Sequence, residues 1–116
     1  MAGETVDAFV RALEDLEVAL QENGRRSRRM LARIAELKAA IADGRSLAEI
    51  VPEEERPLIV TLLTENAATL HEFGVRVRRT EAKALHDEGM TMEQIAGLFG
   101  VTRQRVSALL RDTRQD

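Results

Sequence analysis

The stretch Thr91-Met-Glu-Gln-Ile-Ala-Gly-Leu-Phe-Gly-Val-Thr-Arg-Gln-Arg-Val-Ser-Ala-Leu-Leu110 predicts two short helices that are joined by a tight turn. Thr91 is placed to cap the first helix and Thr102 to cap the second. Gly100 falls where the chain reverses, and glycine adopts a left-handed backbone conformation without steric cost. Val101 follows as an apolar plug. The remaining apolar residues recur at helical spacing and predict the buried side: Ile95, Ala96, Phe99, Val106, Leu109 and Leu110.

The second of these helices carries polar side chains that suit base edges and phosphates. Arginine binds guanine bidentately, glutamine binds adenine in the same way, and serine suits a phosphate or a base edge. In helix-turn-helix proteins the N-terminal residues of the second helix enter the major groove. A helical hairpin that only packs on the rest of the protein is the structural alternative. We expect DNA binding, through Thr102, Arg103, Gln104, Arg105, Ser107 and Arg111.

Residues 91–106 resemble the helix-turn-helix of region 4 in the bacterial sigma-70 family, which reads the −35 promoter hexamer. The matching positions are Thr91, Glu93, Ile95, Phe99, Gly100, Val101, Thr102, Arg103, Arg105 and Val106. The resemblance covers about the last third of the chain and implies DNA contacts by Arg103, Gln104, Arg105 and Ser107, as in small bacterial transcriptional regulators.

The chain departs from that family in two ways. After Val106 the family continues with polar residues, whereas this chain has Ser107-Ala-Leu-Leu110. The chain also lacks tryptophan and tyrosine, and no stretch resembles the aromatic-rich region that melts the −10 element. The resemblance therefore implies DNA reading, and neither promoter melting nor binding to RNA polymerase.

The first 41 residues show a heptad pattern, in which apolar residues alternate in steps of three and four. Asn23 and Ser27 interrupt the pattern beside Gly24. One long helix with a polar notch fits this pattern, and so does an antiparallel hairpin hinged near Gly24. The unbroken spacing favours the long helix. The seam, which needs a second copy or a later helix of the same chain as its partner, comprises Val6, Phe9, Leu13, Leu16, Leu20, Asn23, Ser27, Met30, Ile34, Leu37 and Ile41.

Three further helices are expected before the hairpin. Ser46 and Glu49 form a capping box for a short helix that ends at Pro52. Pro57 starts a longer helix, which continues with a bend at Gly74 into a helix over residues 78–89. The fold class is therefore all-α, with a long-helix, coiled-coil-like region over residues 1–77 for dimerisation or interaction. A three-helix helix-turn-helix unit over residues 78–116 follows it.

The charge of the chain is distributed unevenly. Its net charge is −3. Residues 1–73 hold nine basic and fourteen acidic side chains, a net charge of −5, whereas residues 74–116 hold eight basic and six acidic ones, a net charge of +2. A local basic face is enough to attract phosphates. The stronger basic cluster of Arg25, Arg26, Arg28 and Arg29 is either a second anion contact or a solvated face, and we favour the solvated face.

Several protein classes are excluded by composition. The chain has no cysteine, which excludes disulfides and thiolate metal sites. His71 and His86 lack companions at metal-ligand spacing, and no glycine-rich loop is present to hold phosphates. We therefore expect neither an enzyme nor a bound metal or cofactor. No apolar run is long enough to span a membrane, and no signal peptide is evident. We expect a protein of the bacterial cytoplasm.

These observations predict a sequence-specific transcriptional regulator that binds double-stranded DNA through its C-terminal helix-turn-helix. One such unit reads only a few base pairs, so we expect a homodimer on two half-sites. The alternative is an adaptor or antitoxin-like protein whose N-terminal helices bind another protein. The sequence specifies no operator, no effector and no direction of regulation.

Overall fold

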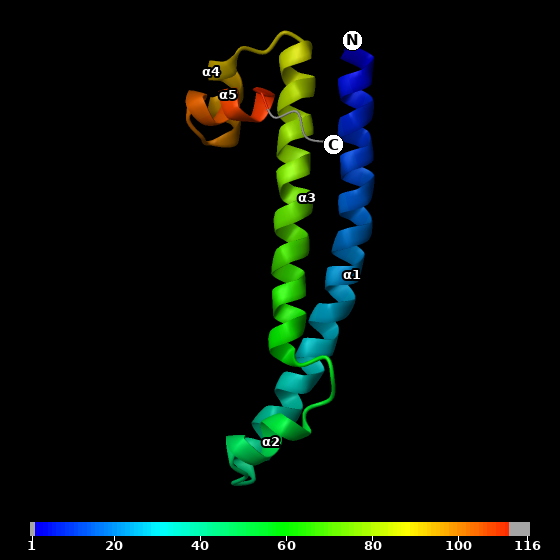
Figure 1. Ribbon diagram of the computed structural model, residues 1–116, viewed down its shortest axis with the longest axis vertical. Coiled ribbons are helices and arrows are strands. Elements are labelled where there is room, and N and C mark those ends of the chain that lie inside the picture. The colour runs from blue at the N-terminus through cyan, green and yellow to red at the C-terminus, as the bar shows by residue number, and fades with distance from the viewer. Residues whose placement is uncertain (1, 112–116) are drawn as a thin grey trace. The chain divides into compact units, whose positions relative to one another are not determined.

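The computed structural model describes residues 2–111, and this part of the chain is all-α as predicted (Figure 1). It contains five helices and no strand within those residues. They are α1 (Ala2–Ala42), α2 (Leu47–Glu53), α3 (Ile59–Asp87), α4 (Met92–Phe99) and α5 (Arg103–Arg111). None of these helices is both long enough and apolar enough to cross a membrane.

The two long helices are continuous. α1 runs through Gly24, so the long-helix prediction is confirmed and a hairpin hinged at this glycine is wrong. α3 likewise runs through Gly74 and includes most of the helix that was predicted over residues 78–89. Pro52 was expected to end α2 but lies inside it, one residue before its end at Glu53. The chain forms two compact units: residues 19–70, and residues 2–18 together with 71–111.

In the unit of residues 19–70, α1 and α3 are joined by reciprocal bonds between two asparagines. The Nδ2 of Asn23 donates to the backbone oxygen of Asn66 over 3.3 Å, and the Nδ2 of Asn66 donates to the backbone oxygen of Asn23 over 3.4 Å. The Nε of Arg26 donates to the Oδ1 of Asn66 over 3.1 Å. Asn23 is buried, and these bonds satisfy polar groups that would otherwise be costly to bury.

The two helices are antiparallel in this unit, because contacts that move forward along α1 move backward along α3. Asn23 contacts Asn66, Arg26 forms an ion pair with Glu65, and Arg33 bonds to the backbone oxygen of Pro57, two residues before α3.

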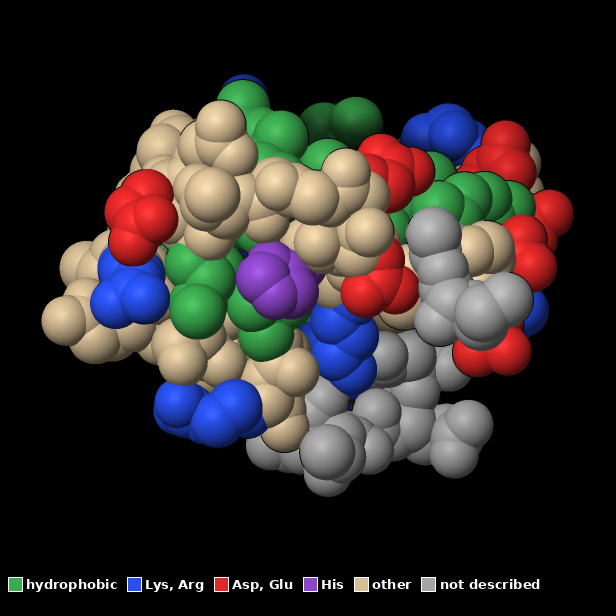
Figure 2. Space-filling view, turned by 90° about the horizontal axis from the view of Figure 1, so that it is seen from above, with side chains coloured by type: hydrophobic (Ala, Val, Ile, Leu, Met, Phe, Trp, Pro, Cys, Tyr) green, Lys and Arg blue, Asp and Glu red, His purple; other side chains and the backbone are tan. Residues whose placement is uncertain are grey.

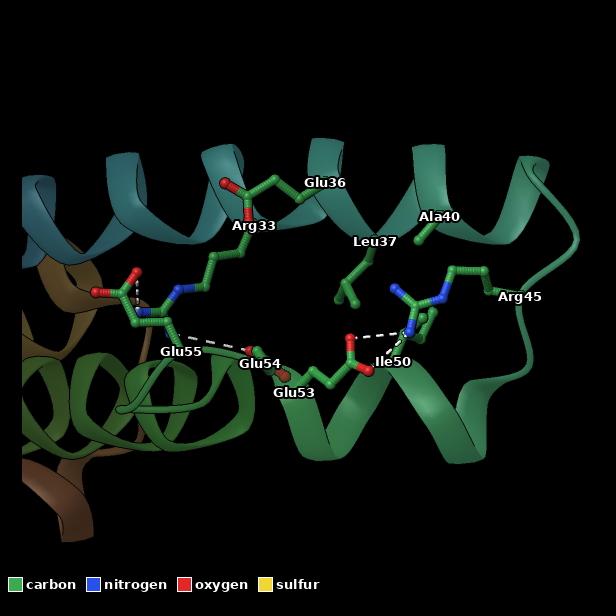
Figure 3. Close-up of a pocket in the computed structure, with 9 residues that line it drawn as sticks. All are labelled: Arg33, Glu36, Leu37, Ala40, Arg45, Ile50, Glu53, Glu54 and Glu55. Carbon is green, nitrogen blue, oxygen red and sulfur yellow. Dashed lines mark hydrogen bonds and ion pairs between the residues drawn. The ribbon is translucent and has the colours of Figure 1, made fainter.

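Figure 3 shows a second polar group in this unit, where α1 faces α2 and the segment that follows it. Arg33 is buried, and its guanidinium lies 3.9 Å from Glu54 and 3.8 Å from Glu55. Arg45 donates to both carboxylate oxygens of Glu53 over 2.8 Å. This hydrogen bond and the charge of Glu53 raise the pKa of Arg45. Arg33 and Arg45, the two arginines of this polar group, therefore each have a carboxylate partner within the same unit.

The predicted seam of α1 is only half right. Leu16, Met30 and Leu37 are half-buried, but five other members of the seam are exposed: Leu13, Leu20, Ser27, Ile34 and Ile41. Of the residues one position earlier, Ala12, Ala19 and Arg33 are buried and Arg26 and Ala40 are half-buried. The small alanines on the buried side let the backbones of packed helices approach closely, and the larger side chains then flank the contact.

In the unit of residues 2–18 and 71–111, polar contacts again join α1 to α3. The hydroxyl of Thr5 donates to Oδ2 of Asp87 over 2.9 Å, and Arg76 forms an ion pair with Asp15. Ala12 and Thr80 are buried in this unit. The same unit contains the hairpin of α4 and α5.

Candidate nucleic-acid interface

The turn between α4 and α5 has the backbone geometry that the sequence predicts. Gly100 ends α4 with φ 67° and ψ 35°, which is the left-handed conformation. The N–H of Val101 donates to the carbonyl of Ala96 over 3.1 Å, the six-to-one hydrogen bond of a Schellman motif. Three residues, Gly100 to Thr102, separate the two helices, and α5 begins at Arg103. One expectation is wrong: Val101 is 38% exposed and does not plug the turn.

Side-chain caps define the first turn of each helix of the hairpin. Thr91 accepts from the N–H of Gln94 over 3.1 Å, and the Oε1 of Gln94 accepts from the N–H of Thr91 over 2.8 Å. Thr102 accepts from the N–H of Arg105 over 3.1 Å. Both threonines therefore cap their helices as predicted, and Thr102, an expected DNA contact, also has a structural role.

A small apolar core fixes the hairpin against the end of α3. Its fully buried residues are Ala82 on α3, Ile95 on α4 and Val106 on α5. The core is therefore shared by three helices, α3, α4 and α5. Three helices are also what a helix-turn-helix unit needs to bury its own core. The cluster consists of Ala82, Ile95, Ala96, Val106 and Leu109, and Leu85, Met90, Met92, Phe99 and Leu110 pack against it.

The polar residues of α5 divide into two groups by their position around the helix. Gln104, Ser107 and Arg111 follow Arg103 by one, four and eight residues, which places all four within about 100° around the helix. Arg105 lies two positions after Arg103, a rotation of about 200°, and therefore faces elsewhere. Ser107 is half-buried, and the other five predicted residues are exposed: Thr102, Arg103, Gln104, Arg105 and Arg111.

Two arginines of that side make contacts within the hairpin. The Nε of Arg103 lies 2.8 Å from Oε1 of Glu93 on α4, and both side chains are more than 60% exposed. The Nη1 of Arg111 donates to the hydroxyl of Ser107 over 2.8 Å. A hollow at the start of α5 is lined by Met92, Arg103, Gln104 and Ser107. Three of the six predicted residues thus lie around one hollow, beside a fixed carboxylate.

The sequence did not reveal that Glu93 would become the partner of Arg103. Its position in the first turn of α4 predicted only a favourable interaction with the helix dipole. The two residues meet because the turn at Gly100 brings the starts of both helices together. Acidic and basic side chains are also mixed more widely, since Figure 2 shows Lys and Arg in several separate groups on the face that it draws.

The chain matches no protein-family model, no curated protein and no solved structure. Within residues 2–111, no group of three or more histidine or carboxylate side chains is arranged to hold a metal ion.

Proposed function

We propose that this protein is a transcriptional regulator that binds double-stranded DNA through the α4–α5 hairpin, with α5 as the recognition helix. The observation that carries the proposal is the exposed side of α5, where Arg103, Gln104 and Ser107 surround one hollow. Arginine and glutamine make bidentate bonds to purines in the major groove, and the hairpin presents both at the N-terminal end of its second helix, as helix-turn-helix proteins do.

Each predicted residue has a distinct task in this proposal. Arg103 and Gln104 contact base edges, and Ser107 contacts a base edge or a phosphate. Arg111 and Arg105 contact phosphates on different sides of α5, and Thr102 presents its capped helix start to the backbone. The resemblance to region 4 of the sigma-70 family supports the same assignment and favours a bacterial, cytoplasmic protein. A homodimer would present two such helices to a two-fold symmetric site.

The test is selection of labelled duplexes from a random pool, followed by fluorescence anisotropy across a salt series. The R103A/Q104A variant is compared with R11A/Q21A, which removes the same residue types from exposed positions of α1. We expect the chain to enrich a two-fold symmetric sequence, and only the α5 variant to lose that preference. Binding that is weak, indifferent to sequence and abolished by salt would contradict the proposal, because phosphate contacts alone behave in this way.

A second candidate function is that of an adaptor or antitoxin-like protein. It is favoured by large apolar side chains that remain exposed on α1 and α3, such as Leu31 at 66% and Val60 at 65%. Exposed apolar surface of this kind often marks a protein contact. A different protein that co-purifies in stoichiometric amount would support this second function.

A further inference from the structure

The hollow at the start of α5 has an apolar side to which the proposed function gives no task. Its lining consists of Met92, Arg103, Gln104 and Ser107. The three residues on α5 are polar, whereas Met92, the first residue of α4, ends in a thioether. Met92 is half-buried and packs against the apolar core of the hairpin. The hollow therefore has a polar side from α5 and an apolar side from α4.

The local fold brings these two sides together. A capping box begins α4 immediately before Met92. The left-handed turn at Gly100 then places the start of α5 beside the start of α4, as the 2.8 Å contact between Glu93 and Arg103 shows. Met92 thus lies at the same end of the hairpin as the side chains that we assign to base edges.

The chemistry of the hollow matches one base. The major groove displays hydrogen-bond donors, hydrogen-bond acceptors and one apolar group, the C5 methyl of thymine. A thioether has no donor and accepts only weakly, so Met92 suits the methyl rather than a polar base edge. Thymine also displays its O4 acceptor beside that methyl, and Arg103 and Gln104 both carry donors. The apolar and polar sides of the hollow therefore correspond to the methyl and the O4 of thymine.

We propose that the hollow binds the 5-methyl group of a pyrimidine in DNA, and that Met92 is the residue that selects it. This inference rests on the proposed function, since it names one base that the α4–α5 hairpin reads. Arg103 lines the hollow and is assigned to a guanine, so the methylated base is a neighbour of that guanine. Thymine and 5-methylcytosine both carry this methyl. Cytosine directs a donor, its amino group, toward the donors of α5, so thymine is expected to bind more tightly.

The first experiment replaces each thymine of the selected duplex, one at a time, by deoxyuridine, which lacks only the methyl group. Fluorescence anisotropy with the full chain measures the dissociation constants. We expect one sensitive position for each bound hairpin, next to the guanine whose identity ceases to matter in the Arg103→Ala variant. There the loss of one buried methyl should raise the dissociation constant roughly fourfold.

Cytosine and 5-methylcytosine at the sensitive position separate the two sources of the methyl. We expect 5-methylcytosine to bind more tightly than cytosine and less tightly than thymine. Binding tighter than that of thymine would uphold the methyl site and identify methylated DNA as its preferred ligand. Equal dissociation constants for thymine and uracil, and for cytosine and 5-methylcytosine, would overturn the inference.

Variants of Met92 test whether this residue selects the methyl. The quantity compared is the ratio of the dissociation constants for the uracil and thymine duplexes, because a variant that only weakens the hairpin affects both duplexes alike. Met92→Leu stays apolar and should keep the wild-type ratio of roughly four, whereas the ratio for Met92→Ala should approach one. Leu98→Ala is the matched control, since Leu98 is another large apolar residue of α4 but is 66% exposed and is not among the residues that line the hollow. A Met92→Ala variant that keeps the wild-type ratio would overturn the role of Met92.

The test remains decisive if Met92→Ala does not fold, as judged by circular dichroism. Met92→Gln then keeps the length of the side chain and removes its apolar end, and the uracil scan of the wild type needs no variant. The inference and the proposed function also fail in different ways. A selected sequence that depends on Arg103 but has no methyl-sensitive position would overturn the inference and leave the proposed function intact. A chain that enriches no sequence would refute both.

Discussion

The carboxylate of Glu93 on α4 lies 2.8 Å from the guanidinium of Arg103, the first residue of α5. In this arrangement the guanidinium is directed toward the carboxylate of Glu93. The ion pair also occupies the side chain that we assign to a guanine, so DNA must displace or share the carboxylate. Since both groups are well exposed, the pair contributes little to stability, about 0.2–1 kcal/mol. Its importance would therefore lie in binding rather than in folding.

Glu93→Gln should strengthen DNA binding, because it frees Arg103 and removes a negative charge beside the phosphates. The free energy of an exposed ion pair is small, so we expect the dissociation constant for DNA to fall by roughly twofold to fivefold at low salt. The effect should be smaller at high salt, which screens the charges. Fluorescence anisotropy with the selected duplex measures this dissociation constant. Glu88→Gln is the matched control, since it removes an equal exposed charge at the start of the α3–α4 link. An equal gain from both variants would show that only net charge matters.

Gly100→Ala should destabilise the protein by about 1–2 kcal/mol, because an L-residue is strained in the left-handed conformation. No atom lies within 4 Å of a Cβ added at Gly100, so strain rather than collision causes the loss. Gly97→Ala is the matched control, because its added Cβ also meets nothing but its backbone is helical. We expect this variant to gain about 0.5–1 kcal/mol. Urea unfolding measures both, and equal effects of the two changes would contradict the role of the turn.

Thr102→Ala should remove the cap of α5 and lower the free energy of unfolding by about 1 kcal/mol. Thr102→Ser keeps a hydroxyl that accepts from the N–H of Arg105 and should retain most of the stability. The pair of variants separates the cap from a contact to DNA. If alanine leaves stability unchanged but weakens binding to the selected duplex, the hydroxyl acts on DNA and its bond to Arg105 is unimportant.

The hairpin was predictable because its determinants are local. Thr91, Gly100 and Thr102 act on backbone groups within a few residues of themselves, and the apolar spacing of Ile95 and Val106 depends only on helix geometry. The ion pair of Glu93 with Arg103 was not predictable in this way. It depends on how the turn directs two helix starts toward each other, which no spacing rule along a single helix describes.

The side of α1 that packs against α3 was predicted only in part, for a different physical reason. Leu16 belongs to the packed stripe and to the predicted seam alike, but the next contact falls on Ala19 rather than on Leu20. Helix periodicity is compatible with either Ala19 or Leu20 at the contact, because the two residues are neighbours at the edge of one broad apolar side of the helix. The choice is made by the partner helix, whose polar groups bond to Asn23 and Arg26. A prediction based on the largest apolar residues therefore identifies residues beside the helix contact, such as Leu20, rather than the smaller residues at its centre, such as Ala19.

Asn23→Ala tests whether that polar contact determines the pairing of α1 with α3. Asn23 is 6% exposed, and its amide donates to the backbone oxygen of Asn66. Alanine removes this part-buried hydrogen bond, so we expect a loss of about 0.5–1.5 kcal/mol in the free energy of unfolding. Gln21→Ala, at an exposed position of the same helix, should change it by less than about 0.5 kcal/mol. Thermal and urea unfolding at one fixed protein concentration make the comparison, so that any self-association affects both variants alike. A loss for Asn23→Ala no larger than that of the control would mean that apolar packing alone sets the register of the pair.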